Sequence, residues 1–159
     1  MLLPIKRILW PTDFSEPSYE ALKDALEMCE LFSAELVAVH AVPEIPRIPP
    51  IAGGENEAAA HIIEIKNYEQ ALHKAAWQKL HEIIRQRVPK GTKSVAIVTH
   101  GDPACEIVRV AEDERVSLIV TATHGLSGWR QLTFGSVAGR VVRVATCPVL
   151  TIRSPRERR

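Results

Sequence analysis

Several signatures that would place a chain in a membrane or in an oxidising compartment are absent from this sequence of 159 residues. No apolar run approaches the roughly 20 residues that a membrane-spanning helix needs. The start, Met1 to Arg7, lacks the apolar core and small-residue cleavage site of a secretory signal. The three cysteines lie far apart and form no CxxC pair, which favours small buried reduced thiols over a disulfide framework. The sequence therefore predicts a cytoplasmic protein without a membrane segment.

The chain also lacks an excess of charge and the common catalytic motifs. Its formal net charge is +1, so composition gives no reason to expect a nucleic-acid partner. No GxxxxGK[ST] loop, HExxH pair or GxSxG elbow is present, and no GxGxxG follows the first apolar run. These absences argue against a P-loop enzyme, a dinucleotide fingerprint, a zinc hydrolase and a serine hydrolase. An adenylyl-transferring enzyme would need a histidine-glycine-histidine motif near residues 11–15, and none is there. We expect no catalytic residue and no metal-ligating set.

What the sequence does contain is a regular alternation of strand and helix patterns. Apolar runs predict strands at 5–10, 36–42, 94–99, 116–121 and 149–153. Helical spacing predicts helices at about 16–32, 58–88, 103–114 and 137–145, the third capped by Asp102 with Pro103 at its first position. The pattern predicts an α/β fold: an open five-stranded parallel sheet with helices on both faces, Rossmann-like, with strand order 3-2-1-4-5. Residues 1–153 are expected to form one nucleotide-binding domain, with a proline-rich surface loop at 43–54 and a flexible basic tail at 154–159.

The stretch from Ala122 to Ser136 organises this pattern, because it joins the fourth strand to the last helix through a glycine-bearing loop. Helix N-termini present unpaired N–H groups and a partial positive charge, which suits an anion. Gly135 has no Cβ, so a phosphate can approach its backbone closely. Ser136 can either cap the helix or donate its hydroxyl to a phosphate oxygen. The alternative is an ordinary strand-to-helix connection in which the glycines serve only for turning.

A second piece of sequence is expected at the same edge of the sheet. In the 3-2-1-4-5 order the first and fourth strands are neighbours, so Thr12 and Asp13 meet the glycine loop where their carboxyl ends lie together. Asp13 is placed to accept hydrogen bonds from ribose hydroxyls, or alternatively to satisfy N–H groups at the start of the first helix. His124 borders the loop and is interpreted as a structural histidine bonded to backbone.

Three arginines lie within the glycine loop or the last helix, namely Arg130, Arg140 and Arg143. They either bring positive charge near phosphates or form a solvated helix face. Sequence alone leaves both alternatives open.

Three motifs together resemble a known family. The first is PTDFS at 11–15, the second is Ala122-x-x-Gly125 followed by nine residues and GSV at 135–137, and the third is CPVL at 147–150. In this order and spacing they are similar to the universal stress proteins. The resemblance covers essentially the whole chain apart from the proline-rich loop and the basic tail.

The resemblance implies an ATP site, with Mg²⁺, built from residues in both pieces of sequence. The family's ATP-binding pattern is G-x-x-G-x9-G-[ST], and Ala122 stands at its first glycine, where one extra methyl is tolerated if φ is negative. The family assigns the ribose to Asp13 and Ala122. It assigns the adenine to backbone at Pro11, Thr12 and Ala41, and the phosphates to Gly125, Gly135, Ser136 and Val137.

The resemblance also implies a nucleotide-dependent stress-response binding module that forms homodimers. The last strand, 148–153, is an apolar edge that needs covering, which gives a physical reason for pairing through it. One alternative is a slow ATPase, although no obvious general base or arginine finger supports fast phosphoryl transfer. Another is a dimeric interaction protein that has lost ATP; Ala122 favours this alternative, whereas Gly125, Gly135 and Ser136 oppose it.

Overall fold

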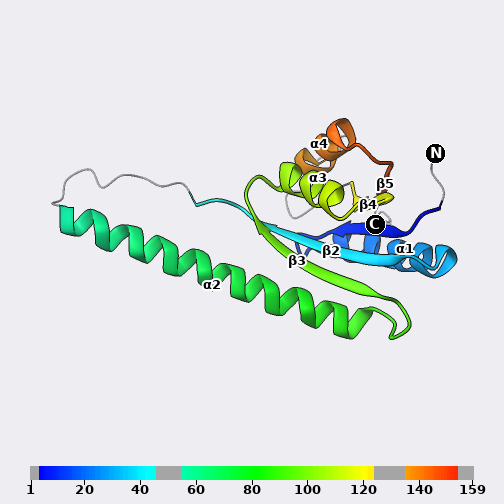
Figure 1. The fold of residues 1–159 in the computed structure, drawn as a ribbon, viewed down its shortest axis with the longest axis horizontal. Helices are drawn as coiled ribbons and strands as arrows, with labels where there is room; N and C mark the ends of the chain where they lie inside the picture. The colour runs from blue at the N-terminus through cyan, green and yellow to red at the C-terminus, as the bar shows by residue number, and fades with distance from the viewer. Residues whose placement is uncertain (1–3, 46–54, 124–134, 154–159) are drawn as a thin grey trace, which may run out of the picture.

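The computed structural model describes residues 4–45, 55–123 and 135–153, apart from the side chains of residues 55–59 and 61. Along the chain the elements are β1 (Arg7–Pro11), α1 (Glu16–Phe32), β2 (Glu35–Val42), α2 (Glu55–Arg87), β3 (Ser94–His100), α3 (Pro103–Asp113), β4 (Leu118–Ala122), α4 (Ser136–Val144) and β5 (Val149–Ile152) (Figure 1). The strands form one parallel sheet in the order β3-β2-β1-β4-β5, so the predicted fold class and strand order are confirmed.

Helices cover both faces of this sheet, and each face has its own apolar core. On one face α1 and α2 pack against alternate residues of the strands, and on the other α3 and α4 pack against the residues between them (Figure 1). Adjacent residues of β1 show the division, since Trp10 belongs to the first core and Leu9 to the second, and both are fully buried. A strand buried on both faces must be apolar throughout, which explains the continuous apolar runs in the sequence.

Local signals start the helices where the sequence predicts. Ser15 precedes α1 in an extended conformation, and its hydroxyl accepts a hydrogen bond from the Ser18 N–H. Asp102 precedes α3, accepts a hydrogen bond from the Cys105 N–H at 3.0 Å, and is followed by Pro103 at the first helical position. These caps satisfy backbone donors that have no acceptor within the helix.

Several element boundaries differ from the sequence expectation by one to three residues. Strand β4 runs to Ala122, whose register partner is Ile152 of β5, so Ala122 is the last strand residue and not the first loop residue. Strand β1 is displaced by one to two residues, and α2 begins at Glu55. Sequence periodicity missed the end of β4 because pairing with β5 decides where that strand stops.

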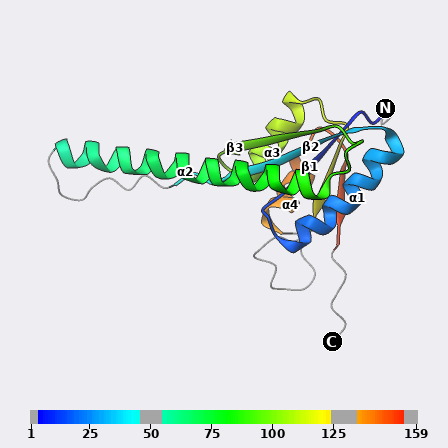
Figure 2. The same cartoon turned by 90° about the horizontal axis from the view of Figure 1, so that it is seen from below.

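Helix α2 extends well beyond the sheet that it covers (Figures 1 and 2). Among its described side chains the buried ones are Ala76, Leu80 and Ile83, all in the second half of the helix. Ile62 and Ile63 in the first half are exposed. None of the helices in the described ranges has the length and apolarity that crossing a bilayer requires.

The buried half of α2 should carry the contribution of this helix to stability. Leu80 is fully buried in the core shared with α1, so Leu80→Ala should lower the free energy of unfolding by about 2–5 kcal/mol through lost burial and a residual cavity. Ile63→Ala, at a side chain that is 59% exposed, is the matched control and should change it little. Urea unfolding measures both, and equal losses would contradict the assignment of the two halves.

Candidate functional site

The site that the sequence predicts lies where β1 and β4 end. These strands pair in parallel, with Ile8 opposite Leu118 and Leu9 opposite Ile119, so their carboxyl ends reach the same edge of the sheet. The connection after β1 runs to β2 on one side, whereas the connection after β4 runs to β5 on the other side, so strand order reverses between β1 and β4. Crevices at such switch points are where open parallel sheets bind ligands.

The turn between β1 and α1 is held in place by Thr12. Its N–H donates to the Val39 carbonyl at 2.9 Å, and its hydroxyl accepts from the Phe14 N–H at 3.0 Å. The same hydroxyl lies 2.9 Å from the Ser18 hydroxyl. Phe14 has a φ of 64°, which is unusual for a bulky residue and is stabilised here by its hydrogen bond to Thr12. The turn is therefore a fixed feature at this edge of the sheet.

Asp13 follows directly and contributes to the start of α1. Its Oδ1 accepts a hydrogen bond from the Ser15 N–H at 3.0 Å and another from the Ser15 hydroxyl. This is the helix-start role that the sequence left open as an alternative. A ribose contact for Asp13 stays a prediction, and any such contact would be made by a carboxylate whose orientation Ser15 already sets.

Pro11 and Ala41 share one face of the sheet. Leu9 and Val39 belong to the core under α3 and α4, and side chains two residues apart in a strand point to the same face. Pro11 and Ala41 therefore lie on the α3/α4 side, at the carboxyl ends of neighbouring strands. The structure brings these two predicted residues onto the same side of the same edge.

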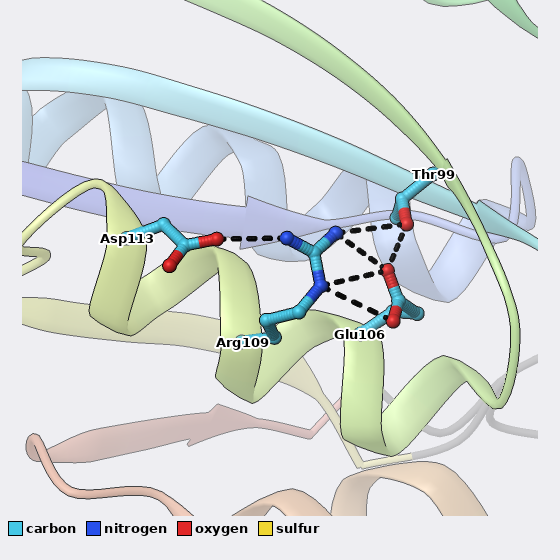
Figure 3. A network of polar contacts seen from close by, with 4 residues as sticks. All are labelled: Thr99, Glu106, Arg109 and Asp113. Carbon is cyan, nitrogen blue, oxygen red and sulfur yellow. Dashed lines mark hydrogen bonds and ion pairs between the residues drawn. The ribbon is translucent and has the colours of Figure 1, made fainter.

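A polar network holds the next strand against α3 on this side (Figure 3). Thr99, the register partner of Ala41, donates its hydroxyl to Glu106 and accepts from Arg109 Nη2 at 3.2 Å. Arg109 also contacts Glu106 at 2.7 Å and Asp113 at 2.7 Å. The hydrogen bond from Arg109 holds the pKa of Glu106 below its usual value, so this carboxylate stays ionised. The network fixes the position of the β3 end beside Ala41.

Ala122 points away from this side of the sheet. It is buried in the opposite core with Ile8 and Trp10, and it is not among the residues that have a positive φ. The extended backbone of β4 accepts an alanine without strain. The methyl group that distinguishes this chain from the G-x-x-G pattern is therefore an apolar core contact.

The start of α4 lies beside the end of β4. The Gly135 N–H donates to the Thr123 carbonyl at 2.6 Å, and the Thr123 N–H donates to Ile152 at 2.9 Å. Gly135 is the residue before the helix and provides no side-chain cap. Ser136 is the first helical residue and is exposed, so it does not cap α4, and Val137 follows it. Thr123 is the link in this arrangement that sequence reasoning missed.

The central part of the predicted phosphate loop lies outside the described residues. This includes Gly125, His124 and Arg130, whose predicted roles stay predictions.

Arg140 is engaged elsewhere on the surface. Its Nη1 contacts Asp102 Oδ2 at 2.7 Å and links α4 to the N-cap of α3. This hydrogen bond, with a second from the Cys105 N–H, lowers the pKa of Asp102 to about 2. Of the two alternatives for Arg140, the solvated helix face fits better, because an acidic partner already balances its charge.

His40 is a second residue near the site that the sequence did not single out. Its Nδ1 lies 2.8 Å from the Thr12 carbonyl, and its ring stacks on Phe14 with centroids 4.3 Å apart. Lys79 of α2 places its Nζ 4.7 Å from the centre of the Phe14 ring. Burial lowers the pKa of His40, so the neutral imidazole supports the turn from the α1/α2 side. The sequence signal for His40 was its position as a polar residue within the apolar run 36–42.

A hollow of about 1310 Å³ lies at the other edge of the sheet, near the amino ends of the strands. Its lining includes Lys6, Glu35 and Lys93 and mixes both signs of charge. It contains none of the predicted site residues, so it is not the ligand crevice of the switch point.

Comparisons with known proteins agree with this arrangement. A sequence model of the universal stress protein family matches residues 4–153. Universal stress protein MJ0531 of Methanocaldococcus jannaschii is 33% identical over 152 residues, which span 96% of this chain and 84% of that protein. The solved structure of protein MJ0577 from the same organism has a TM-score of 0.80 at 29% identity, covering 96% of this chain and 99% of that one.

Two solved universal stress proteins share the fold at lower identity. One is a complex with cAMP, at 20% identity and a TM-score of 0.58, covering 95% of this chain and 98% of that one. The other, from Archaeoglobus fulgidus, is a complex with dAMP, at 22% identity and a TM-score of 0.56, covering 94% and 98%.

The buried position of His40 predicts a pH dependence of stability. The pKa of His40 is lower in the folded protein than in the unfolded chain. As the pH falls below about 6.5, His40 is therefore protonated in the unfolded chain before it is protonated in the folded protein. The free energy of unfolding decreases over this range, until the pH reaches the lowered pKa of the folded protein. His40→Asn should remove this part of the dependence. Denaturant unfolding at about pH 7.5 and about pH 5 should show wild type losing more stability than the variant. An unchanged difference between the two proteins at both pH values would refute this role.

Proposed function

Because the chain belongs to the universal stress protein family, we propose that its switch-point crevice binds ATP and that the protein acts as a nucleotide-dependent binding module in a stress response. In this proposal Asp13 and Ala122 hold the ribose, and backbone at Pro11, Thr12 and Ala41 borders the adenine. The phosphates lie at Gly125, Gly135, Ser136 and Val137. Mg²⁺ enters with the phosphates, since it commonly keeps several waters and binds through phosphate oxygens.

The observation that carries the proposal is the start of α4. Its N-cap is a glycine without a side-chain acceptor, so the N–H groups of the first helical turn have no side-chain cap at Gly135. These N–H groups lack acceptors within a helix, and together with the helix dipole they favour an anion. The Gly135–Thr123 hydrogen bond places this helix start at the end of β4, next to the turn that carries Asp13.

The adenine position is supported by the shared face of Pro11 and Ala41. In this proposal backbone groups at these strand ends distinguish the hydrogen-bonding edge of adenine from that of guanine. The complexes with cAMP and with dAMP mean that adenine nucleotides bind to other proteins of this fold. The Ala122 methyl lies in the opposite core, which argues against the alternative of a protein that has lost ATP binding through this alanine.

We propose a cytoplasmic location, where ATP is abundant and thiols stay reduced. Burial raises the pKa of Cys29 to about 11, so this thiol is protonated and unreactive at neutral pH.

Calorimetric titration with ATP and Mg²⁺ tests the site. Gly135 has a φ of −53°, which other residues adopt readily, so Gly135→Val should fold while its branched side chain obstructs the phosphates. We expect binding at least about tenfold weaker, or ~1.4 kcal/mol. Gly91→Val is the matched control, because nothing lies within 4 Å of a Cβ there and the turn is remote from the crevice.

We expect wild type to bind ATP more tightly than GTP. No heat with ATP at millimolar concentration, equal affinity for both nucleotides, or unaltered ATP binding by Gly135→Val would each overturn the assignment.

We further propose that the protein self-associates through β5. This strand is the last in the sheet and pairs within the chain only with β4 in the described residues. The carbonyls of Pro148 and Ile152 accept from β4, so in the alternating strand pattern Leu150 also faces β4. Val149 and Thr151 then direct their backbone groups to the open edge, where a two-fold related β5 would pair in antiparallel fashion.

Thr151→Pro tests this edge, because it removes a donor that faces outward and leaves the β4–β5 ladder intact. The nucleotide-free variant should sediment at half the mass of wild type at micromolar concentration. Retained ATP binding is the control for folding. A variant that keeps the wild-type mass would show that assembly does not use β5.

A further inference from the structure

The turn that carries Asp13 contains a backbone conformation that a bulky residue disfavours. Phe14, the next residue, has a φ of 64°, in the left-handed region where its Cβ is crowded by the backbone. Such a conformation persists only where surrounding contacts hold it. The hydrogen bond from the Phe14 N–H to the Thr12 hydroxyl is one of these contacts, and it lies within the turn itself. Other contacts reach the turn from β2 and from α2.

His40 of β2 holds the peptide group that precedes Asp13. Its Nδ1 lies 2.8 Å from the Thr12 carbonyl oxygen, and because a carbonyl can only accept, Nδ1 carries the proton and donates it. The peptide group that follows Asp13 contains the Phe14 N–H, which the Thr12 hydroxyl holds. Both peptide groups that flank Asp13 are therefore held by hydrogen bonds. Together they set the direction in which the Asp13 side chain leaves the backbone.

The ring of Phe14 is contacted by side chains of two elements. The His40 ring stacks on it, with centroids 4.3 Å apart and planes 26° apart. Lys79 of α2 places its Nζ 4.7 Å from the ring centre, a cation–π contact. Lys79 directly precedes Leu80, which is fully buried in the core that α1 and α2 share (Figure 2). The position of Lys79 therefore follows the packing of α2 on the sheet.

We propose that His40 and Lys79 are positioning residues for the nucleotide, and that they couple the packing of α2 to nucleotide binding. This inference rests on the proposed ATP site, in which Asp13 holds the ribose. With both contacts in place the turn already has the conformation that the ribose meets, so binding does not have to order it. Without them Phe14 can leave its disfavoured φ, only a fraction of the molecules is competent, and the apparent affinity falls by that fraction.

Thermodynamic coupling of this kind is reciprocal. If the packing of α2 favours the conformation of the turn that binds ATP, bound ATP must in turn hold α2 more firmly against the sheet. The effect should be found in the buried half of α2, which contains Lys79 and Leu80.

Calorimetric titration with ATP and Mg²⁺ measures the effect on affinity. His40→Leu removes the donor to Thr12 and should weaken binding about tenfold. His40→Asn keeps an N–H donor close to the position of Nδ1 and should recover most of the affinity. Lys79→Met removes the charge from a side chain of similar length and should weaken binding about threefold. Lys74→Met, at an exposed lysine of the same helix, is the matched control and should bind as wild type does.

A double-mutant cycle tests whether Lys79 acts through the ring. Phe14→Leu removes the aromatic face and keeps an apolar side chain, so Lys79→Met should have no further effect on ATP affinity in that background. A threefold loss that persists there would mean that Lys79 attracts the charge of the nucleotide directly, and it would overturn the inference. So would a His40→Leu variant that binds as wild type does, or a His40→Asn variant as weak as His40→Leu.

Hydrogen exchange separates this inference from the proposed function. Without nucleotide, the Phe14 amide should exchange faster in Lys79→Met than in wild type or in Lys74→Met. Added ATP should slow exchange at Leu80 more in wild type than in Lys79→Met. Faster exchange at Phe14 with unchanged ATP affinity would overturn the inference and leave the ATP site standing. Unchanged exchange at Phe14 would overturn it as well, and a wild type that binds no ATP would overturn both.

Discussion

The parallel pairing of β1 with β4 is the constraint on which the rest of this structure depends. It joins the two halves of the sheet, and it brings the turn after β1 and the connection after β4 to one edge. The amino end of this pairing is held by Arg7, which contacts Glu35 at 2.8 Å and Glu114 at 2.5 Å. The Ser117 N–H donates to the Arg7 carbonyl at 2.9 Å. Because strand register is constant along a ladder, contacts at the amino end set the positions of the carboxyl ends, where the proposed site lies.

Alternation along the strands lets the same few residues serve the core and the crevice. In β1, Trp10 fills the α1/α2 core while Pro11 faces the α3/α4 side. In β4, Ala122 fills the first core, and Thr123 connects β4 to β5 and to the start of α4. From the α1/α2 side, His40 also holds the turn after β1 through its contacts with Thr12 and Phe14. A substitution on either side of these strands therefore affects packing and the geometry of the edge together.

Two parts of the molecule remain incompletely covered by the described chain, and they differ in chemistry. The β5 edge offers backbone donors and acceptors, so its natural partner is another strand. The projecting half of α2 carries exposed apolar side chains, among them Ile62 and Ile63. Helix α2 packs on β2 and β3, whereas β5 is the outermost strand on the other side of the sheet.

Sequence by itself determined the order of the elements, the parallel sheet and its strand order. Apolar periodicity, helix caps such as Asp102 and the right-handed crossover rule act locally, so they can be recognised without coordinates. The sequence also identified the two chain segments that meet at the switch point. It could not fix the end of β4, because pairing of Ala122 with Ile152 defines that end. Only the tertiary structure decided contacts between residues distant in sequence: the Ala122 methyl in the core, Arg140 on Asp102, and His40 against Thr12. These depend on register and on how each helix is rotated against the sheet, and local sequence carries no record of either.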